Sequence, residues 1–228
     1  AEVHGGNQTR LFEVFPGGGL TLTGLKLSGG SAGEGGAVYS HYANLTFDRC
    51  NFDGNLAMDG SGGAVWARGG NVTVVGGEFF RNTATRVGGA VYALGPGPEA
   101  PVPVCSITDA EFVSNSAYEH DDDDDDDEAH YSSADVSIQS GGAAMFMYAV
   151  VDITDSVFSG NYATHSGGAV DGSYGETSIV VTGCTFGNNT SGGFGGAIIA
   201  SFLTLGGGTQ LTNNSASEGG GAVSRSIV

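Results

Sequence analysis

Short segments of alternating apolar and polar residues recur along the chain. In Leu20-Thr-Leu-Thr23, for example, two leucines alternate with two threonines. Alternation with a period of two residues predicts a strand with one buried face, and the Gly, Asn and Asp residues that bound the segments predict turns. No stretch has a convincing helical period. The segments are residues 20–23, 45–48, 72–75, 105–108, 151–154, 179–182 and 203–206.

Two motifs accompany these segments and define a repeat. The first, Gly-Gly-Ala, recurs at intervals of 27, 26, 53, 26, 28 and 25 residues. In the second, an apolar residue is followed three positions later by Asn. The 53-residue interval is interpreted as one turn with insertions at about residues 94–103 and 117–138. The alanines of the first motif are Ala37, Ala64, Ala90, Ala143, Ala169, Ala197 and Ala222.

A repeat of ~26 residues with several short strands and glycine corners is typical of a parallel β-solenoid. We therefore predict an all-β chain of about seven turns, with neighbouring turns ~4.8 Å apart. Residues 20–228 are expected to form a single β-helix. Residues 1–19 are expected to form a partial first turn or an N-terminal edge.

Stacked turns place equivalent residues in columns. One apolar column, expected to point inward, is Leu22, Phe47, Val74, Ile107, Ile153, Val181 and Leu205; a second is Phe52, Phe79, Phe112, Phe158 and Phe186. An asparagine column at one corner is expected to form a ladder of amide hydrogen bonds. Its members are Asn55, Asn82, Asn115, Asn161, Asn189 and Asn214. Cys50 and Cys184 share a column four turns apart, ~19 Å at this spacing, which is too far for a disulfide.

The two motifs together carry a resemblance to a known family. Phe158-Ser-Gly-Asn161, followed by Gly167-Gly-Ala-Val170, resembles the repeat of the chlamydial polymorphic outer-membrane proteins and is similar to related β-helix proteins of bacterial and algal surfaces. The resemblance covers roughly residues 10–228. It implies a right-handed parallel β-helix, a cell-surface or secreted location, and adhesive or structural work. The C-terminal membrane barrel of the chlamydial proteins has no recognisable counterpart in this sequence.

Charge and hydropathy narrow the range of partners. The chain has 7 Lys and Arg residues against 25 Asp and Glu residues, for a net charge of -18. Phosphate binding requires clustered cations, so we predict no nucleic-acid partner. The longest apolar run, Ala143–Val151, has nine residues, whereas a spanning helix needs ~20. We therefore predict no transmembrane segment.

An acidic run lies in the second insertion. Because a block of like charges repels itself and stays extended, we expect a solvated loop. The alternative is weak binding of Ca²⁺, the one cofactor that the sequence offers, although the run lacks the spacing of a preformed calcium loop. Its residues are Asp121, Asp122, Asp123, Asp124, Asp125, Asp126, Asp127 and Glu128.

Three asparagines, each the first residue of an Asn-x-Ser/Thr sequon, are candidates for glycosylation. Asn44 and Asn71 each precede an inward position, so their side chains are expected to point outward. They would accept glycans in a host that glycosylates such sites. Asn7 begins a third sequon near the N-terminus.

Aromatic residues occupy one position in three consecutive turns. Tyr39, Trp66 and Tyr92 lie two residues after the repeat alanine and should point outward. An exposed stack of this kind either docks sugar rings or another subunit, or simply stabilises the surface. Met145 and Asp171, at the equivalent position of later turns, are not expected to extend it.

Outward threonines raise a minor alternative. Thr21, Thr46 and Thr73 share one column, and a flat threonine array on a solenoid could order water and bind ice. Asp48 and Asp152 interrupt the threonine columns, and Thr favours strands in any case. Ice binding therefore stays a minor alternative.

A catalytic site is not expected. Enzymes built on β-helices combine carboxylates with a Lys, Arg, Tyr or His base on one face. The nearest arrangement is formed by Asp109, Asp152 and Asp155, whereas the single lysine, Lys26, lies in the first turn. We predict that the chain is not an enzyme.

These features predict an extracellular or cell-surface structural or adhesive β-helix module. Neither end carries the polar cap that a solenoid normally needs. The expected partners are therefore flanking parts of a longer chain, or a second copy stacked head to tail into a filament. The alternative is a carbohydrate-binding or polysaccharide-processing β-helix with glycans as partners.

Overall fold

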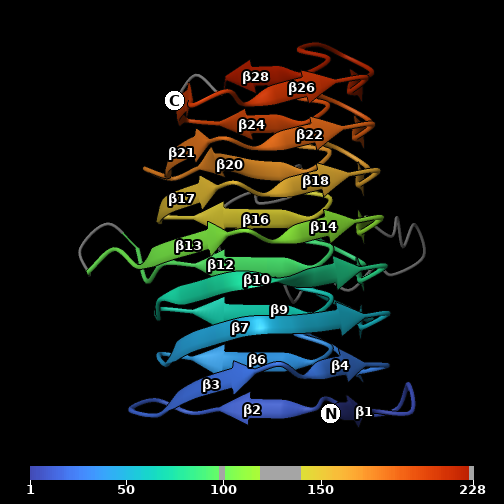
Figure 1. The fold of residues 1–228 in the computed structure, drawn as a ribbon, viewed down its shortest axis with the longest axis vertical. Helices are drawn as coiled ribbons and strands as arrows, with labels where there is room; N and C mark the ends of the chain where they lie inside the picture. Colours follow the sequence, from blue (N-terminus) through green and yellow to red (C-terminus); the bar gives the residue numbers. More distant parts are fainter. Residues whose placement is uncertain (98–100, 119–139, 226–228) are drawn as a thin grey trace, which may run out of the picture.

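The chain coils into a stack of turns built from strands that are joined by tight corners (Figure 1). A computed structural model describes residues 1–97, 101–118 and 140–225. All strand pairs in this part of the chain are parallel, and each strand pairs with its counterparts in the neighbouring turns. The prediction of an all-β parallel solenoid of about seven turns is confirmed. The described residues contain no helix long and apolar enough to cross a bilayer.

Three sheets run along the stack. Sheet A contains β1 (Glu2–His4), β3 (Gly19–Thr23), β4 (Lys26–Ser28), β7 (Asn44–Asp53), β10 (Val72–Phe80), β13 (Val104–Thr108), β14 (Glu111–Val113), β17 (Val150–Thr154), β18 (Val157–Ser159), β21 (Ser178–Thr182), β22 (Thr185–Gly187), β25 (Phe202–Gly206) and β26 (Gln210–Thr212). Sheet B contains β2 (Phe12–Val14), β6 (Val38–His41), β9 (Val65–Arg68), β12 (Val91–Leu94), β16 (Ala144–Met147), β20 (Val170–Tyr174), β24 (Ile198–Ala200) and β28 (Val223–Arg225). Sheet C contains β5 (Ser31–Ala32), β8 (Leu56–Ala57), β11 (Thr83–Ala84), β15 (Ser116–Ala117), β19 (Tyr162–Ala163), β23 (Thr190–Ser191) and β27 (Ser215–Ala216).

The first residues already belong to the stack. Strand β1 pairs with β4, and β2 pairs with β6. The described parts of the two insertions follow β12 and β15, which end at Leu94 and Ala117. After each insertion the chain returns to register, because Cys105 pairs with Val72 and Ala144 with Val91.

Columns of like residues fill the interior. The five stacked phenylalanines are fully buried, with ring centroids 4.5 to 4.8 Å apart and ring planes within 9° of parallel. The other apolar column is buried from Leu22 to Val181. Leu205 is the exception to the predicted inward column, since 40% of it is exposed. It lies in β25, which pairs only with β21 among the described residues. The three cysteines are buried free thiols, as the column spacing predicts.

The paired glycines make the corner between sheets C and B. Gly62 has a φ of 66°, a left-handed conformation that a side chain would strain. A Cβ on Gly63 would collide with the carbonyl oxygen of Gly89 in the next turn. The Gly-Gly-Ala motif is therefore a packing requirement of closely stacked corners.

The phenylalanine stack predicts a large loss of stability on truncation. Phe112 lies between Phe79 and Phe158, at 4.5 and 4.8 Å. We expect Phe112→Ala to lower the free energy of unfolding by about 3 to 5 kcal/mol, because it opens a cavity in the stack. Chemical denaturation followed by circular dichroism measures the change. Val157→Ala, in the adjacent column and 36% exposed, is the control and should cost under about 1 kcal/mol. Equal losses in the two variants would contradict this account of the core.

Candidate functional site

The outer face of sheet B carries the most varied side-chain chemistry among the described residues. Because side chains alternate across a strand, the inward Val38 and Val65 are followed by the outward Tyr39 and Trp66. The register extends this outward column over the whole sheet. Its members from β6 to β28 are Tyr39, Trp66, Tyr92, Met145, Asp171, Ile199 and Ser224.

The aromatic rings of this column stack on one another. Tyr39 and Trp66 are parallel, with centroids 4.5 Å apart and planes 4° from parallel. Tyr92 lies on the other side of Trp66, at 6.3 Å and tilted by 50°. The guanidinium of Arg10 lies 4.7 Å from the centroid of the Tyr39 ring. The ring faces are thus occupied by neighbouring turns, and the rings present their edges to the surroundings.

Two expectations about this column need correction. Trp66 and Tyr92 are 9% and 8% exposed, so they are not an open aromatic surface. The cluster also continues to Met145, which is fully buried, although the sequence pattern was expected to end at Tyr92. The reason is lateral cover from positions off the column: Val87 and Met147 belong to the same cluster, and Leu94, Tyr148 and Tyr174 pack against it.

Charged groups border the aromatic stack at its N-terminal end. Arg10 donates hydrogen bonds to the carbonyl oxygens of Glu34 and Gly35, at 2.8 and 3.3 Å. The Glu34 carboxylate accepts the Ser61 N–H at 2.8 Å. Burial raises the pKa of Glu34, opposed by that hydrogen bond and by the charges of Arg86 and Arg10. Burial also raises the pKa of Tyr92, whose hydroxyl lies 3.1 Å from the Met147 sulfur.

Asp171 is a buried carboxylate in the middle of this face. Its Oδ1 accepts the N–H and the hydroxyl of Ser173, at 2.8 and 2.6 Å. Its Oδ2 is buried and has no hydrogen-bond partner. Burial raises the pKa of Asp171 to about 6, against the hydrogen bonds from Ser173 and the backbone of Ser140. Sequence reasoning missed this group: the available signal was a carboxylate between the apolar Met145 and Ile199 of this column.

The asparagine column forms a continuous buried ladder. The Oδ1 of each later asparagine accepts both the backbone N–H and the Nδ2 of the asparagine one turn earlier, at 2.9 to 3.1 Å. Each Nδ2 also donates to a carbonyl oxygen of the apolar column, such as Phe79 for Asn115. The amides are therefore engaged within the protein. Members of the ladder are Asn55, Asn82, Asn115, Asn161, Asn189 and Asn214.

The other candidate residues are spread over separate surfaces. The sequon asparagines Asn7, Asn44 and Asn71 are exposed, and the Oδ1 of Asn44 accepts the N–H of Asn71. The acidic run, residues 121–128, lies outside the described residues. Within the described ranges, no three His, Cys, Asp or Glu residues are close enough together to hold a metal ion.

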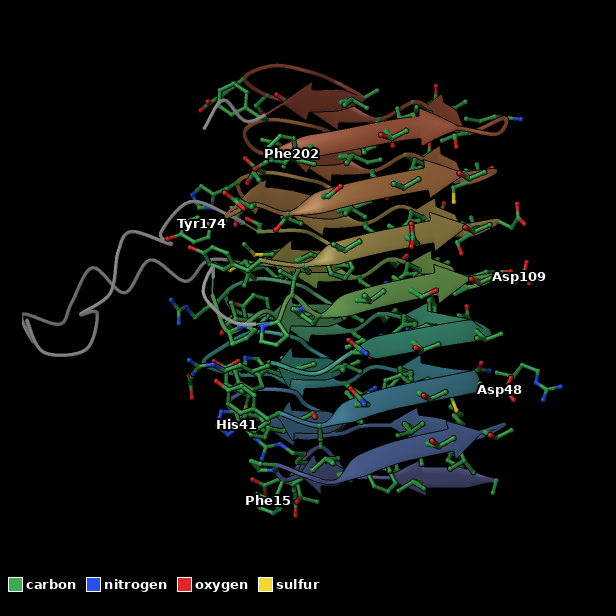
Figure 2. The ribbon with its side chains drawn as sticks, turned by 90° about the vertical axis from the view of Figure 1, so that its left-hand side faces the viewer. Phe15, His41, Asp48, Asp109, Tyr174 and Phe202 are labelled. Atoms are coloured by element: carbon green, nitrogen blue, oxygen red, sulfur yellow. The ribbon has the colours of Figure 1, made fainter. Side chains whose placement is uncertain are left out.

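The candidate carboxylates of the sheet A side are far from the aromatic cluster. Figure 2 shows His41, Tyr174 and Phe202 along one side of the solenoid, and Asp48 and Asp109 along the opposite side. Asp109 and Asp155 are exposed corner residues with φ near 50°, and Asp152 is exposed on β17.

The threonine columns have the expected register but are mixed in composition. Thr21, Thr46 and Thr73 are in line, and the column continues through Ser106 to Asp152. A carboxylate therefore interrupts the hydroxyl array in the structure, as it does in the sequence.

Comparison with known proteins bears on one turn of the stack. Residues 155–173 match the Chlamydia polymorphic membrane protein repeat. The match runs from the corner before β18 to the fourth residue of β20, and it includes Phe158, Asn161 and the Gly167-Gly-Ala corner. The predicted resemblance to this repeat is thus confirmed in the turn from which its two motifs were quoted. Comparison with curated proteins and with solved structures gave no significant match.

The single tryptophan reports on the cover of the aromatic stack. Because Trp66 is buried between Tyr39 and Tyr92, we expect blue-shifted fluorescence that acrylamide quenches poorly. Trp66→Ala should lower the free energy of unfolding by about 3 to 5 kcal/mol. Phe194→Ala, at a residue 42% exposed, should cost under about 1 kcal/mol. Emission typical of tryptophan in water would contradict the buried stack.

The asparagine ladder predicts that the stability lost on replacing an asparagine depends on its place in the ladder. Asn115→Ala leaves the Asn82 N–H and the Phe79 carbonyl oxygen without their present partners inside the protein. At ~1 to 3 kcal/mol for each unsatisfied buried group, we expect a loss of about 3 kcal/mol or more. Asn214→Ala, at the half-buried end of the ladder, should cost less because water can replace the amide. Denaturation of both variants tests this, and a larger loss at Asn214 would rule it out.

Proposed function

We propose that the chain is a rigid structural or adhesive module exposed at a cell surface. The observation that carries the proposal is the uninterrupted stacking of the phenylalanine column and the asparagine ladder. Seven rungs at ~4.8 Å make a stiff unit of about 34 Å. The surface location is supported by the match of one turn to a repeat of membrane proteins.

A module of this kind works by presenting its lateral surfaces. In the interior, amides hydrogen-bond to amides and rings stack on rings, and both stabilise the stack. Recognition of a partner therefore falls to the outer faces and the loops. The exposed sequon residues Asn44 and Asn71 lie on adjacent turns, Asn44 at the start of β7 and Asn71 directly before β10. Glycans at these positions would project sideways from the stack.

The proposal includes no catalytic activity. The single lysine, Lys26, forms exposed ion pairs with Glu2 and Asp53, at 3.4 and 3.5 Å. The carboxylates of Asp109 and Asp155 lie at exposed corners several turns further along the chain. This separation supports a structural role over polysaccharide processing. The covered faces of Trp66 likewise count against a sugar-stacking platform on sheet B.

We further propose that the last described turn is an axial contact surface. Phe202 and Leu205 are 51% and 40% exposed, and together with Leu203 and Val223 they line an open hollow. Exposed apolar residues on the open face of a solenoid turn favour contact with another turn. A second copy stacked head to tail would supply it, as would further turns of a longer chain.

Immunogold electron microscopy of intact source cells, with an antibody to the folded chain, tests the proposed function. We expect gold particles on the outer surface of unpermeabilised cells, because a structural or adhesive module must be accessible there. Permeabilised cells provide the control for antibody access. Labelling restricted to permeabilised cells would overturn the surface role.

Electron microscopy of the purified chain tests the axial contact. Head-to-tail stacking predicts filaments with a subunit repeat near 34 Å. Leu205→Glu at the open end should shorten them, whereas Val157→Glu on the lateral face should not.

A further inference from the structure

Asp171 combines burial with incomplete hydrogen bonding. It is 0% exposed, and its Oδ2 is the one buried side-chain oxygen or nitrogen without a hydrogen-bond partner in the described part of the chain. Burial of an ionised carboxylate is costly unless a cation or several donors compensate it. The two hydrogen bonds from Ser173 fall on Oδ1 alone.

The neighbouring turns make the surroundings of this carboxylate apolar. Met145 precedes Asp171 in the column and Ile199 follows it. Gly167, at the corner of the same turn, packs so closely that a Cβ on it would lie 2.9 Å from the Asp171 Cβ. The carboxylate is thus enclosed by its own turn and by both adjacent turns.

The titratable groups near Asp171 in the described residues lie on the flanking turns and at the Ser140 corner. Strands β16 and β24 carry no titratable side chain, while Tyr148 follows β16 and Tyr174 ends β20. His165 lies close to the same corner, where its backbone N–H donates to the Ser140 hydroxyl. The backbone of Ser140 in turn contacts Asp171. Within the described residues, hydrogen bonds to the Asp171 carboxyl group come from the uncharged Ser173 and from the backbone of Ser140.

We propose that Asp171 is a proton-binding site through which mild acidification stabilises this turn of the solenoid. The proton binds Oδ2, the oxygen without a partner, and removes a buried negative charge. The step is a simple protonation: the carboxylate takes up one proton from the solvent, and no other bond forms or breaks. The consequence goes beyond the structural role: protonation of Asp171 stabilises the folded module in a mildly acidic medium, and this contribution is lost as the medium becomes neutral.

The direction in which stability changes with pH follows from the linkage between protonation and folding. The pKa of Asp171 is raised to about 6 in the folded chain from 3.8, so the folded state binds the proton more tightly than the unfolded state does. The destabilisation of the folded state by the ionised Asp171 carboxylate is complete above about pH 7. It disappears as the pH falls through 6 toward 4. Each pKa unit is tenfold in the equilibrium constant, so the unfolding constant changes by up to ~100-fold.

The experiment compares three full-length proteins by chemical denaturation from pH 4 to pH 8. Asp171→Asn replaces the carboxylate with a neutral side chain of the same shape. The ratio of the wild-type unfolding constant to that of Asp171→Asn should rise by roughly 50- to 100-fold between pH 4 and pH 7.5. Asp152→Asn makes the same charge change at an exposed position of β17 and controls for general repulsion in a chain of net charge -18. Its ratio should vary by less than about threefold.

A second measurement does not depend on how the variant folds. Carbon-13 NMR of the wild-type protein, with the Asp171 carboxyl assigned through its backbone, gives the pKa directly. Titration near pH 6 supports the proposal. A midpoint below about 4.5, or parallel pH profiles for wild type and Asp171→Asn, would overturn it.

Discussion

The rung-to-rung hydrogen bonding of parallel strands is the constraint on which the rest of this structure depends. Once strands of successive turns pair in register, every residue lies directly above and below its counterparts, ~4.8 Å away. Only side chains that interact well with copies of themselves can fill such columns. Flat phenylalanine rings and primary amides meet this requirement, since rings stack on rings and each amide both donates to and accepts from the next.

The same constraint explains the glycines. Close stacking brings the corner of one turn against the corner of the next, so the main chain of Gly63 lies where any side chain would strike the Gly89 carbonyl. Insertions are tolerated because they leave the corners and strands unchanged: Ala143 and Ala144 resume the register of Ala90 and Val91 after the longest one. The repeat is therefore defined by its corners and columns, and its length varies between them.

The outer face of sheet B shows how columns of unlike residues behave. Tyr39, Trp66 and Tyr92 stack in part, Met145 fills the next place, and Asp171 interrupts the apolar series. A polar residue in such a column has no identical neighbour to bond with, in contrast to Asn115 in the ladder. This difference leaves one oxygen of Asp171 unpartnered and gives the face its sensitivity to protonation.

Local pattern in the sequence determined the strands, the corners, the inward columns and the asparagine ladder, because all of these repeat every turn and depend on nearest neighbours in the stack. Only the tertiary structure decided which outward residues are covered. Trp66 lies in a buried cluster with Val87, which comes from outside its column, and no repeat period encodes that packing. The burial of Asp171 was likewise decided in three dimensions. The physical reason is that solvent exposure depends on neighbours from several turns at once, whereas strand alternation and register depend on the spacing along the chain.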